Sequence, residues 1–485
     1  MGKRMTPWWL LALAVVAAGC LESDWANQPN VVLIIIDDLG WADVGAYGST
    51  FYETPNIDRL AASGALFTRF YAASSVCSPT RASIMTGKYP ARLHLTNWIG
   101  GEQQGKMLPA EYIRQLPLEE MTVGEAFKKA GYATGFIGKW HLGEEPYYPE
   151  FQGFDVNVAG HAAGQPGSYF FPYENERLPW SNVPDLEDGK DGEYLTDRLT
   201  DEALDFIAAN RGQPFLLVLS HYAVHTPLQA KPEASSRFES KATALPQPST
   251  PAFVAEGPSA TTKTRQDHPV YAAMVESSDE SVGRILDQLE ELGIASNTAV
   301  VFVSDNGGLS TLSGERTYMP TANLPLRAGK GWLYEGGIRV PLIIHWPGVV
   351  DTAVTIAEPT ISTDLYATLL AIAGLTPEPQ QHQDGLSLAP LLTQSGSIDR
   401  VAIYWHFPHY HGSGNVPSAA VRAGGFKLIE WLEDGEFELY NLLDDPGETK
   451  DLAEELPGKA IELSSLLHGW RESMDARMPR QNPQR

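Results

Sequence analysis

The sequence predicts an α/β fold: a large, mostly parallel sheet sandwiched by helices, followed by a smaller C-terminal antiparallel α+β domain. Apolar, β-branched runs alternate with amphipathic helical segments, as in parallel sheets that are buried on both faces. Several of these runs end in polar residues of catalytic type. Beyond about Asp399 the pattern changes to short strands separated by turns. We therefore expect one large domain at residues 28–396 and a smaller domain at 397–485.

The strands of the large sheet are predicted from continuous apolar runs. The run Val-Val-Leu-Ile-Ile-Ile at 31–36 favours a fully buried parallel strand, because neither face of the strand carries polar side chains. Ligands bind at the carboxyl ends of the strands in such sheets, so the polar residues that follow the runs should converge. The expected strands cover residues 31–36, 66–71, 133–137, 215–219, 299–303 and 340–345.

Helices between these strands are predicted from caps, prolines and 3.6-residue periodicity. Pro55 is suited to the first turn of a helix, and Thr122 with Glu125 forms a capping box. Apolar residues at 199, 203 and 206 share one face of a third helix. The expected helices begin near 54 and 122 and cover residues 196–209, 271–292 and 363–373.

Two further segments are predicted to lie outside the regular pattern. The stretch 233–267 is rich in proline, serine, threonine and alanine, which favours an excursion or a long surface loop. Residues 376–383 resemble a linker between the domains. In the smaller domain we expect strands at 401–406, 418–422, 426–431 and 437–440 and a closing helix at 456–474.

The composition is globular but strongly acidic. The chain has 485 residues, 43% of them hydrophobic, and a net charge of −25. A nucleic-acid partner is disfavoured, because such proteins present a basic face. An anionic substrate would be repelled by the overall field and would need local cations around its site.

The N-terminus has the pattern of an export sequence. A basic start is followed by an apolar run that is too short to span a bilayer, and by Ala-Ala-Gly-Cys at 17–20. This end resembles a bacterial lipobox, in which Cys20 would be acylated, although position 17 is alanine where leucine is usual. Residues 1–20 are therefore expected to be a signal peptide, and the protein a periplasmic or outer-membrane-anchored lipoprotein; a plain cleaved signal is the alternative. A membrane contact is expected only through this anchor.

Cys77 is the second of the two cysteines in the chain, and it precedes a predicted helix. Ser78 is expected to be the N-cap, Pro79 the first helical residue and Gly87 the C-terminal stop. The positive end of the helix dipole would then favour an anion beside Cys77, with Arg81 one turn further on. A lone thiol in an oxidising compartment is a liability, unless it is converted to another group.

The spacing Cys-x-Pro-x-Arg, followed by Ala-Ser-x-x-Thr-Gly, resembles the signature of the type I sulfatases of the alkaline phosphatase superfamily. The resemblance implies an alkaline-phosphatase-like fold. It also implies that a formylglycine-generating maturation enzyme converts Cys77 to 3-oxoalanine (formylglycine), whose hydrate is the nucleophile. The alternative is a buried structural cysteine before an ordinary helix.

Two acidic pairs indicate a metal site. Asp37-Asp38 and Asp305-Asn306 follow two of the expected strands and supply the hard oxygen ligands that Ca²⁺ prefers. Each pair alone is also compatible with a turn or an Asx cap. The family resemblance implies that all four residues, together with the modified Cys77, bind one Ca²⁺.

Further motifs of the family follow in the same order along the chain. Lys139-Trp140-His141 resembles the motif in which the lysine contacts sulfate and the histidine contacts the formylglycine hydroxyl. His225, in His-Thr-Pro, matches the histidine near the leaving-group oxygen, and Lys330 matches a second sulfate-binding lysine. With Arg81 these are the expected catalytic residues, although a single lysine or histidine is more often structural. Asp305 is expected to help deprotonate the nucleophile, and His141 to accept a later proton.

Sugar-binding residues are expected among histidines and aromatic side chains. His161 follows the Lys-x-His motif, and the segment 404–411 holds His406, His409 and His411 among aromatics. Aromatic faces pack on sugar rings and imidazoles bind hydroxyls, but the same pattern fits a strand end packed on the main domain. Weaker candidates are Phe170, Phe171, Trp180 and Trp332.

The predicted function is hydrolysis of sulfate esters on a carbohydrate, such as a polysaccharide- or glycosaminoglycan-derived sugar, with one Ca²⁺ and formylglycine. A narrower expectation is exo-action on sulfated galactose or N-acetylgalactosamine units. One alternative is a formylglycine-dependent phosphomonoester or phosphonate-ester hydrolase. Another is a non-catalytic binder of sulfated glycans.

Overall fold

The computed structural model describes residues 28–247 and 250–484. The predicted signal peptide and Cys20 lie outside the described residues. Within the described part, the helices lack the combination of length and hydropathy that a membrane span requires.

An eight-stranded mixed sheet forms the centre of the large domain, with β1 (Asn30–Ile36) near its middle. β1 pairs in parallel with β10 (Thr298–Ser304) on one side and with β7 (Phe215–Ser220) on the other. The apolar run therefore lies where no strand edge meets solvent, as predicted. The order β13-β2-β12-β10-β1-β7-β5-β6 is completed by β2 (Ala65–Phe67), β5 (Ala133–Gly138), β6 (Val156–Val158), β12 (Leu342–His345) and β13 (Val354–Ile356).

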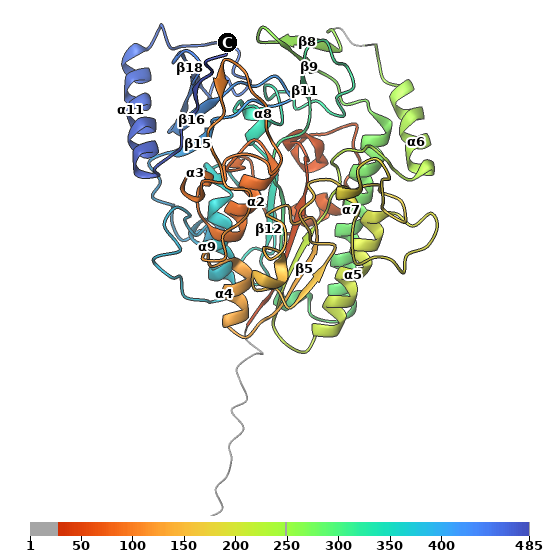
Figure 1. The fold of residues 1–485 in the computed structure, drawn as a ribbon. Helices are drawn as coiled ribbons and strands as arrows, with labels where there is room; N and C mark the ends of the chain where they lie inside the picture. The colour runs from red at the N-terminus through yellow and green to blue at the C-terminus, as the bar shows by residue number, and fades with distance from the viewer. Residues whose placement is uncertain (1–27, 248–249, 485) are drawn as a thin grey trace, which may run out of the picture.

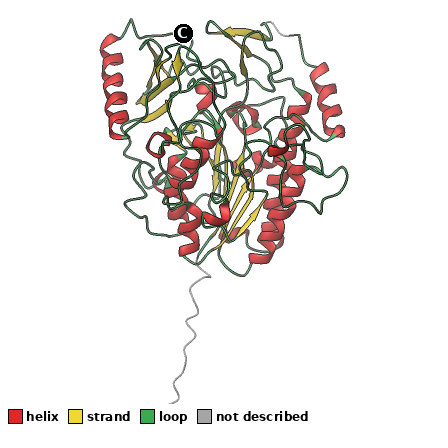
Figure 2. Ribbon diagram, in the orientation of Figure 1, coloured by secondary structure: helices red, strands yellow, loops and turns green. Residues whose placement is uncertain are grey.

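Helices cover both faces of this sheet (Figures 1 and 2). The alternation of side chains along β1 explains the two layers, because successive residues point to opposite faces. Val32, Ile34 and Ile36 pack into a core with α5 and α7, whereas the odd-numbered residues between them pack with α2, α4 and α9. The layers consist of α1 (Pro55–Ala62), α5 (Leu195–Asn210) and α7 (Pro269–Glu291), and of α2 (Cys77–Thr86), α4 (Val123–Lys129), α9 (Thr363–Ile372) and α10 (Ala389–Leu392).

The C-terminal domain is a four-stranded antiparallel sheet with one long helix against it. Its strands follow one another in sequence order; the last two connections are short turns, whereas the loop 408–417 joins the first two strands. Trp405 is fully buried and donates its indole hydrogen to the carbonyl of Ala72 in the large domain, which ties the two parts together. The elements are β15 (Ile403–Phe407), β16 (Ser418–Ala423), β17 (Phe426–Trp431), β18 (Phe437–Asn441) and α11 (Pro457–Ser473).

Three expectations about elements were wrong. The run 66–71 is interrupted at Thr68, whose amide donates to Ile356, and its two halves belong to different sheets. The predicted excursion 233–267 contains regular structure, namely α6 (Pro232–Thr243) and a hairpin of β8 (Phe253–Glu256) and β9 (Ala260–Lys263). Ser78 is not an N-cap: α2 already begins at Cys77, and the Ser78 hydroxyl accepts from the Ile99 amide instead.

The remaining short elements connect these layers. They are β3 (Phe70–Tyr71), α3 (Pro90–Leu93), β4 (Met107–Leu108), β11 (Thr311–Ser313), α8 (Glu335–Ile338), β14 (Thr360–Ile361), β19 (Arg480–Gln481) and the 3₁₀ turns Trp41–Asp43, Gly45–Tyr47, Pro149–Phe151, Pro179–Ser181 and Ala295–Asn297.

Candidate active site

The carboxyl ends of the central strands meet at one edge of the sheet. In the register of the sheet Ile36 lies opposite Ser304, and Gly138 lies opposite Ser220. The residues that follow these positions must therefore leave the sheet side by side. This register brings Asp37, Asp38, Lys139, Asp305 and Asn306 together, although they are up to 269 positions apart in sequence.

Three carboxylates form a buried cluster at this edge. One oxygen from each of Asp37, Asp38 and Asp305 lies within 4.8 Å of the others. Burial raises the pKa of Asp37 well above its usual range, despite the nearby Lys139. Burial also opposes ionisation of Asp38, but Lys330, His225 and Lys139 together outweigh it and hold the pKa of Asp38 well below its usual range.

Each carboxylate of the cluster faces a buried cation. Lys139 Nζ lies 2.5 Å from Asp37 Oδ2, and Lys330 Nζ lies 2.6 Å from Asp38 Oδ1. Arg81 Nε donates to Asp305 Oδ2 over 2.8 Å, while its Nη1 donates to the carbonyl of Lys139 and to Ser220 Oγ. Arg81 thereby connects α2 to the ends of three strands.

Cys77 is the first residue of α2 and lies beside these charges. It is only 3% exposed, and burial raises the pKa of its thiol. The helix carries no acidic residue in its first turn, so the positive end of its dipole is not cancelled locally. A group that is negatively charged at position 77 is stabilised by the helix end and by Lys139 and Lys330.

Two histidines flank this position with defined proton arrangements. His141 Nε2 lies 3.2 Å from the carbonyl oxygen of Ile99; because a carbonyl only accepts, Nε2 carries the hydrogen and Nδ1 presents a lone pair. His225 Nδ1 bonds the Thr226 carbonyl in the same way, which turns Nε2 toward Asp38 at 3.7 Å. Burial lowers the pKa of His225 to about 3 and that of His141 well below its usual range, so both rings rest neutral.

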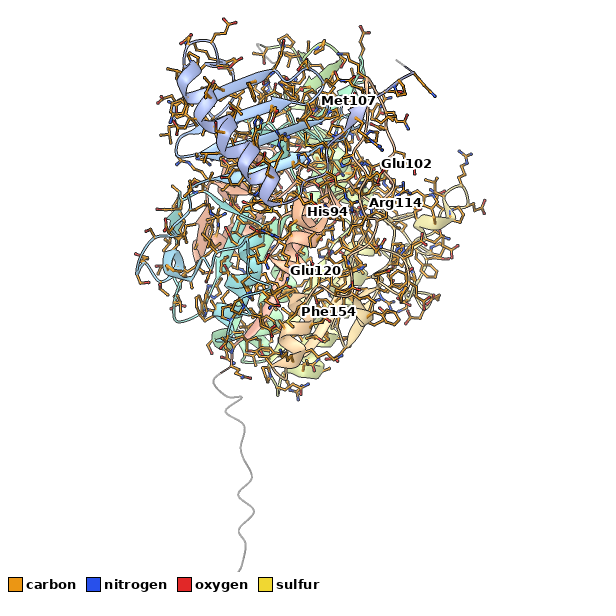
Figure 3. All side chains as sticks on the ribbon, turned by 60° about the vertical axis from the view of Figure 1, so that its left-hand side comes forward. His94, Glu102, Met107, Arg114, Glu120 and Phe154 are labelled. Atoms are coloured by element: carbon orange, nitrogen blue, oxygen red, sulfur yellow. The ribbon has the colours of Figure 1, made fainter. Side chains whose placement is uncertain are left out.

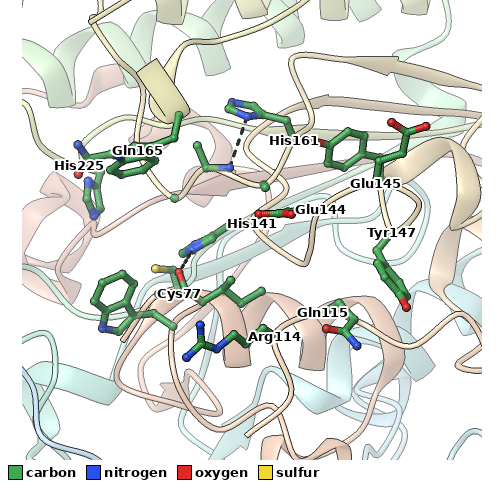
Figure 4. A pocket seen from close by; sticks show the side chains of 18 of the residues that line it. Cys77, Arg114, Gln115, His141, Glu144, Glu145, Tyr147, His161, Gln165 and His225 are labelled. Carbon is green, nitrogen blue, oxygen red and sulfur yellow. Dashed lines mark hydrogen bonds between the residues drawn. The ribbon is translucent and has the colours of Figure 1, made fainter. Parts of the chain in front are cut away.

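Of these groups, Cys77, His141, His225 and Lys330 line a cavity of about 1140 Å³ (Figure 4). Its volume is at the upper end of small-molecule sites, so it accommodates more than a sulfate group alone.

Arg114, one of the residues that line the cavity, lies beside Glu102 (Figure 3), with which it forms an exposed ion pair of 2.7 Å. The lining contains Cys77, His141, His225 and Lys330 together with Trp98, Arg114, Gln115, Glu144, Glu145, Tyr147, Tyr148, His161, Gln165, Trp180 and His411.

The histidine-rich segment contributes a different residue from those expected. His406 is buried and contacts the Arg477 carbonyl, and His409 is buried against Thr96 Oγ1. Neither lines the cavity, so the expectation that these two reach the sugar is corrected, because both rings are engaged in packing between segments. His411 lines the cavity, and so does His161 from the loop after the Lys-x-His motif.

Of the aromatic residues that were expected to bind sugar, one lines the cavity and three do not. Trp180 is exposed and lines the cavity. Trp332 is buried, stacks on Tyr334 and donates to the Ser413 carbonyl, so it supports the floor from behind. Phe170 and Phe171 pack against the core of the large domain. The loop residues Trp98, Arg114, Glu144 and Tyr147 were missed, because they belong to no motif.

The sheet edge combines a nucleophile position, three cations and an acidic cluster below an open cavity, which is the arrangement of a hydrolase for anionic esters. The sulfatase family profile matches residues 29–375, and the profile described as N-sulphoglucosamine sulphohydrolase, C-terminal, matches 328–469. This chain belongs to the sulfatase family and is a sulfuric ester hydrolase with the expected α/β fold.

Individual relatives cover most of the chain. A protein named sulfatase from Formosa agariphila is 32% identical over 95% of this chain and 92% of its own length. Human N-acetylgalactosamine-6-sulfatase is 36% identical over 82% of this chain and 72% of its own. Among solved structures, Ps i-CgsB in complex with k-i-k-neocarrahexaose has a TM-score of 0.73 at 30% identity, covering 92% of this chain and 93% of its own.

Proposed function

We propose that this sulfuric ester hydrolase removes sulfate from a carbohydrate, with formylglycine made from Cys77 and one Ca²⁺ in its site. The observation that carries the proposal is that Cys77 and Lys330 line a cavity with aromatic and hydrogen-bonding walls, while Lys139 is buried against Asp37 at the same edge of the sheet. Aromatic faces and polar groups together suit a sugar. The name of the human relative, N-acetylgalactosamine-6-sulfatase, and the complex of the similar solved structure with k-i-k-neocarrahexaose support the same class.

The residues present fit a calcium ion. Asp37 Oδ1 and Asn306 Oδ1 are buried and have no hydrogen-bond partner among the described residues, and hard oxygens of this kind are calcium ligands. Asp37, Asp38, Asp305 and Asn306 would hold the ion. When bound, the ion supplies positive charge that offsets the charge of the sulfate group.

The environment of Cys77 fits an oxidised, hydrated side chain. It is the free cysteine of the described residues and stands at a helix start among cations. As formylglycine, the residue supplies an oxygen nucleophile where the thiol stands. His141 Nδ1, buried without a partner, is the nearby base that the chain itself offers.

The remaining groups position and neutralise the ester. Lys139 and Lys330 stabilise negative charge on the sulfate oxygens as the S–O bond breaks, a preorganised electrostatic role. His225 lines the cavity, and its Nε2, which is a lone pair in the resting neutral ring, must take up a proton when the ester is bound before it can pass one to the departing sugar oxygen. Both oxygens of Asp305 are engaged, by Arg81 Nε and by the Asp38 amide, so Asp305 mainly fixes Arg81 and the acidic loop. Its expected part in deprotonation stays a prediction.

Substitution of Cys77 tests the nucleophile. Cys77→Ala should abolish turnover of an aryl sulfate and of sulfated sugars, because no other side chain at this place can be oxidised to the aldehyde. Circular dichroism should show an unchanged fold, and mass spectrometry of the peptide containing Cys77 should show conversion in the unmutated protein. Undiminished turnover in the variant contradicts the scheme.

The substrate is tested on position-defined sulfated galactose and N-acetylgalactosamine, alone and at the end of oligosaccharides. The name of the N-acetylgalactosamine-6-sulfatase relative supports action on N-acetylgalactosamine sulfate, and exo-action on these units is part of the proposal. Preference for an aryl phosphate over an aryl sulfate would instead favour the phosphoester alternative. Binding of sulfated glycan without turnover, in protein that contains formylglycine, would favour the binder.

We also propose that the protein is exported and anchored through lipid at Cys20, which rests on the basic, apolar and Ala-Ala-Gly-Cys sequence of residues 1–20. Fatty-acid labelling should mark the protein and should be lost in Cys20→Ala. Equal labelling of the variant contradicts the anchor.

A further inference from the structure

A second cavity, of about 290 Å³, lies where the large domain meets the start of β15. It shares no lining residue with the catalytic cavity. Ile403, at the first position of β15, lines it, whereas His411 of the catalytic cavity follows the far end of the same strand. The two cavities are thus separate openings at opposite ends of β15.

Three arginines line this second cavity. Arg69 comes from the loop between β2 and β3, Arg400 from the segment before β15, and Arg422 from β16 directly opposite Ile403. Glu358 is the one carboxylate of the lining, and its side chain is exposed. We call the cavity with its three arginines the arginine pocket.

The charge of Arg422 is incompletely compensated. The residue is 3% exposed, its Nη1 donates to the Tyr71 hydroxyl, and its Nε has no partner among the described residues. It forms no ion pair within 4 Å in the described chain. The carboxylate that acts on it through space, Glu335, already accepts from Lys427 and from Tyr71. A buried guanidinium with a free donor is costly unless another acceptor is present.

The other two arginines add to this positive charge. The Arg400 side chain is 9% exposed and pairs with Asp364, but its Nε also lacks a partner among the described residues. Arg69 donates to the Ala357 carbonyl at 3.4 Å and has no carboxylate within 4 Å in the described chain. Burial lowers the pKa of Arg69, and Arg422 and Arg339 lower it further by repulsion. Arg69 and Arg422 are therefore held near each other with no carboxylate within 4 Å of either in the described chain, whereas Arg400 is paired with Asp364.

We propose that the arginine pocket binds a tetrahedral oxyanion, sulfate or phosphate, carried on a small organic group such as a sugar. Guanidinium groups match the oxygens of sulfate and phosphate with paired N–H donors. The volume lies at the lower limit of small-molecule sites, which suits one sugar-sized group. Val401 and Leu443, both exposed apolar residues of the lining, offer it an apolar edge.

The number of sulfate ions that the protein binds tests whether the arginine pocket is a binding site in addition to the catalytic cavity. Isothermal titration of the full protein with sodium sulfate, against chloride at equal ionic strength, should show two sites. Arg69→Ala should weaken one site at least tenfold, Lys330→Ala should weaken the other, and the double variant should lose both. Arg69 gives up no ion pair when it is truncated, so the variant should fold. Arg480→Ala, an exposed arginine elsewhere, is the matched control.

Aryl-sulfate turnover of the same variants tests the arginine pocket and the proposed catalytic function separately. Arg69→Ala should leave aryl-sulfate turnover unchanged, whereas Lys330→Ala should not. A single sulfate site, or two sites that survive in Arg69→Ala, overturns the arginine pocket whatever the enzyme hydrolyses. Repeating the titration with inorganic phosphate and with a hexose sulfate identifies the carrier. A hexose sulfate that binds no more tightly than the inorganic ion overturns the organic part of the proposal.

Discussion

At the scale of single residues, the site consists of buried ion pairs between residues that follow different strands. Each cluster carboxylate is held by one cation, so removing either partner leaves a buried charge without compensation. The motifs identified most of these residues, because the chemistry restricts the residue types. They did not reveal that Arg81 contacts Asp305, Lys139 and Ser220 at once, because such pairings depend on how distant strands are aligned.

Lys330→Ala should lower kcat/KM for an aryl sulfate by about 10²–10³, the range for losing one preorganised donor to a developing charge. Lys330→Arg should retain part of the activity, since the charge remains. Lys128→Ala removes an exposed lysine that pairs with Asp155 on the surface and should leave the kinetics unchanged. Equal losses in Lys330→Ala and Lys128→Ala would mean that the lysine does not act on the ester.

At the scale of elements, the strands with continuous apolar runs and the motif-bearing helix could be predicted from sequence, since burial on both faces leaves a local pattern. Ser78 and the histidines of 404–411 could not be placed, because their partners come from other segments. The same limit applies to α1. Its N-cap, Thr54, makes no side-chain cap, and Asp279 of α7 accepts instead from the Asn56 and Ile57 amides.

Asp279 should make stability depend on pH. Burial raises the pKa of Asp279 to about 6, so between pH 4 and 6 the folded state keeps a proton that the unfolded state has lost. The free energy of unfolding should fall in this range as pH rises, by up to about 1.4 kcal/mol per pH unit. The free energy of unfolding, measured with urea at several pH values, should fall less steeply with pH for Asp279→Asn than for the unmutated protein. If the free energy of unfolding depends on pH in the same way for both proteins, Asp279 is not the group responsible.

At the scale of the whole molecule, a buried charge network joins the small domain to the catalytic one. Lys427 of β17 lies 3.1 Å from Glu335 of α8 and 2.9 Å from Glu448, and all three are fully buried. Glu448 also accepts from the Glu335 amide. Because α8 begins five residues after Lys330, the C-terminal sheet supports the loop that carries this lysine, for which we propose a catalytic role.

Lys427→Met should destabilise the protein by about 3–5 kcal/mol, the usual cost of removing one partner of a buried pair. It should also lower kcat for aryl sulfate, since the Lys330 loop loses its support. Adding Glu448→Gln should recover part of the stability, because one of the stranded carboxylates is then neutral. Thermal unfolding and kinetics of the single and double variants measure both effects. A double variant less stable than the single one argues against the network.

The burial of Cys77 also determines whether its oxidation can take place before or after folding. A side chain that is 3% exposed at the first turn of a helix, beneath a cavity walled by loops, cannot enter the active site of another enzyme. Any catalyst that oxidises it must therefore meet the chain while this segment is still extended. Under the proposed conversion of Cys77, oxidation and folding of the polypeptide then compete in time, and a molecule that folds too early keeps its thiol.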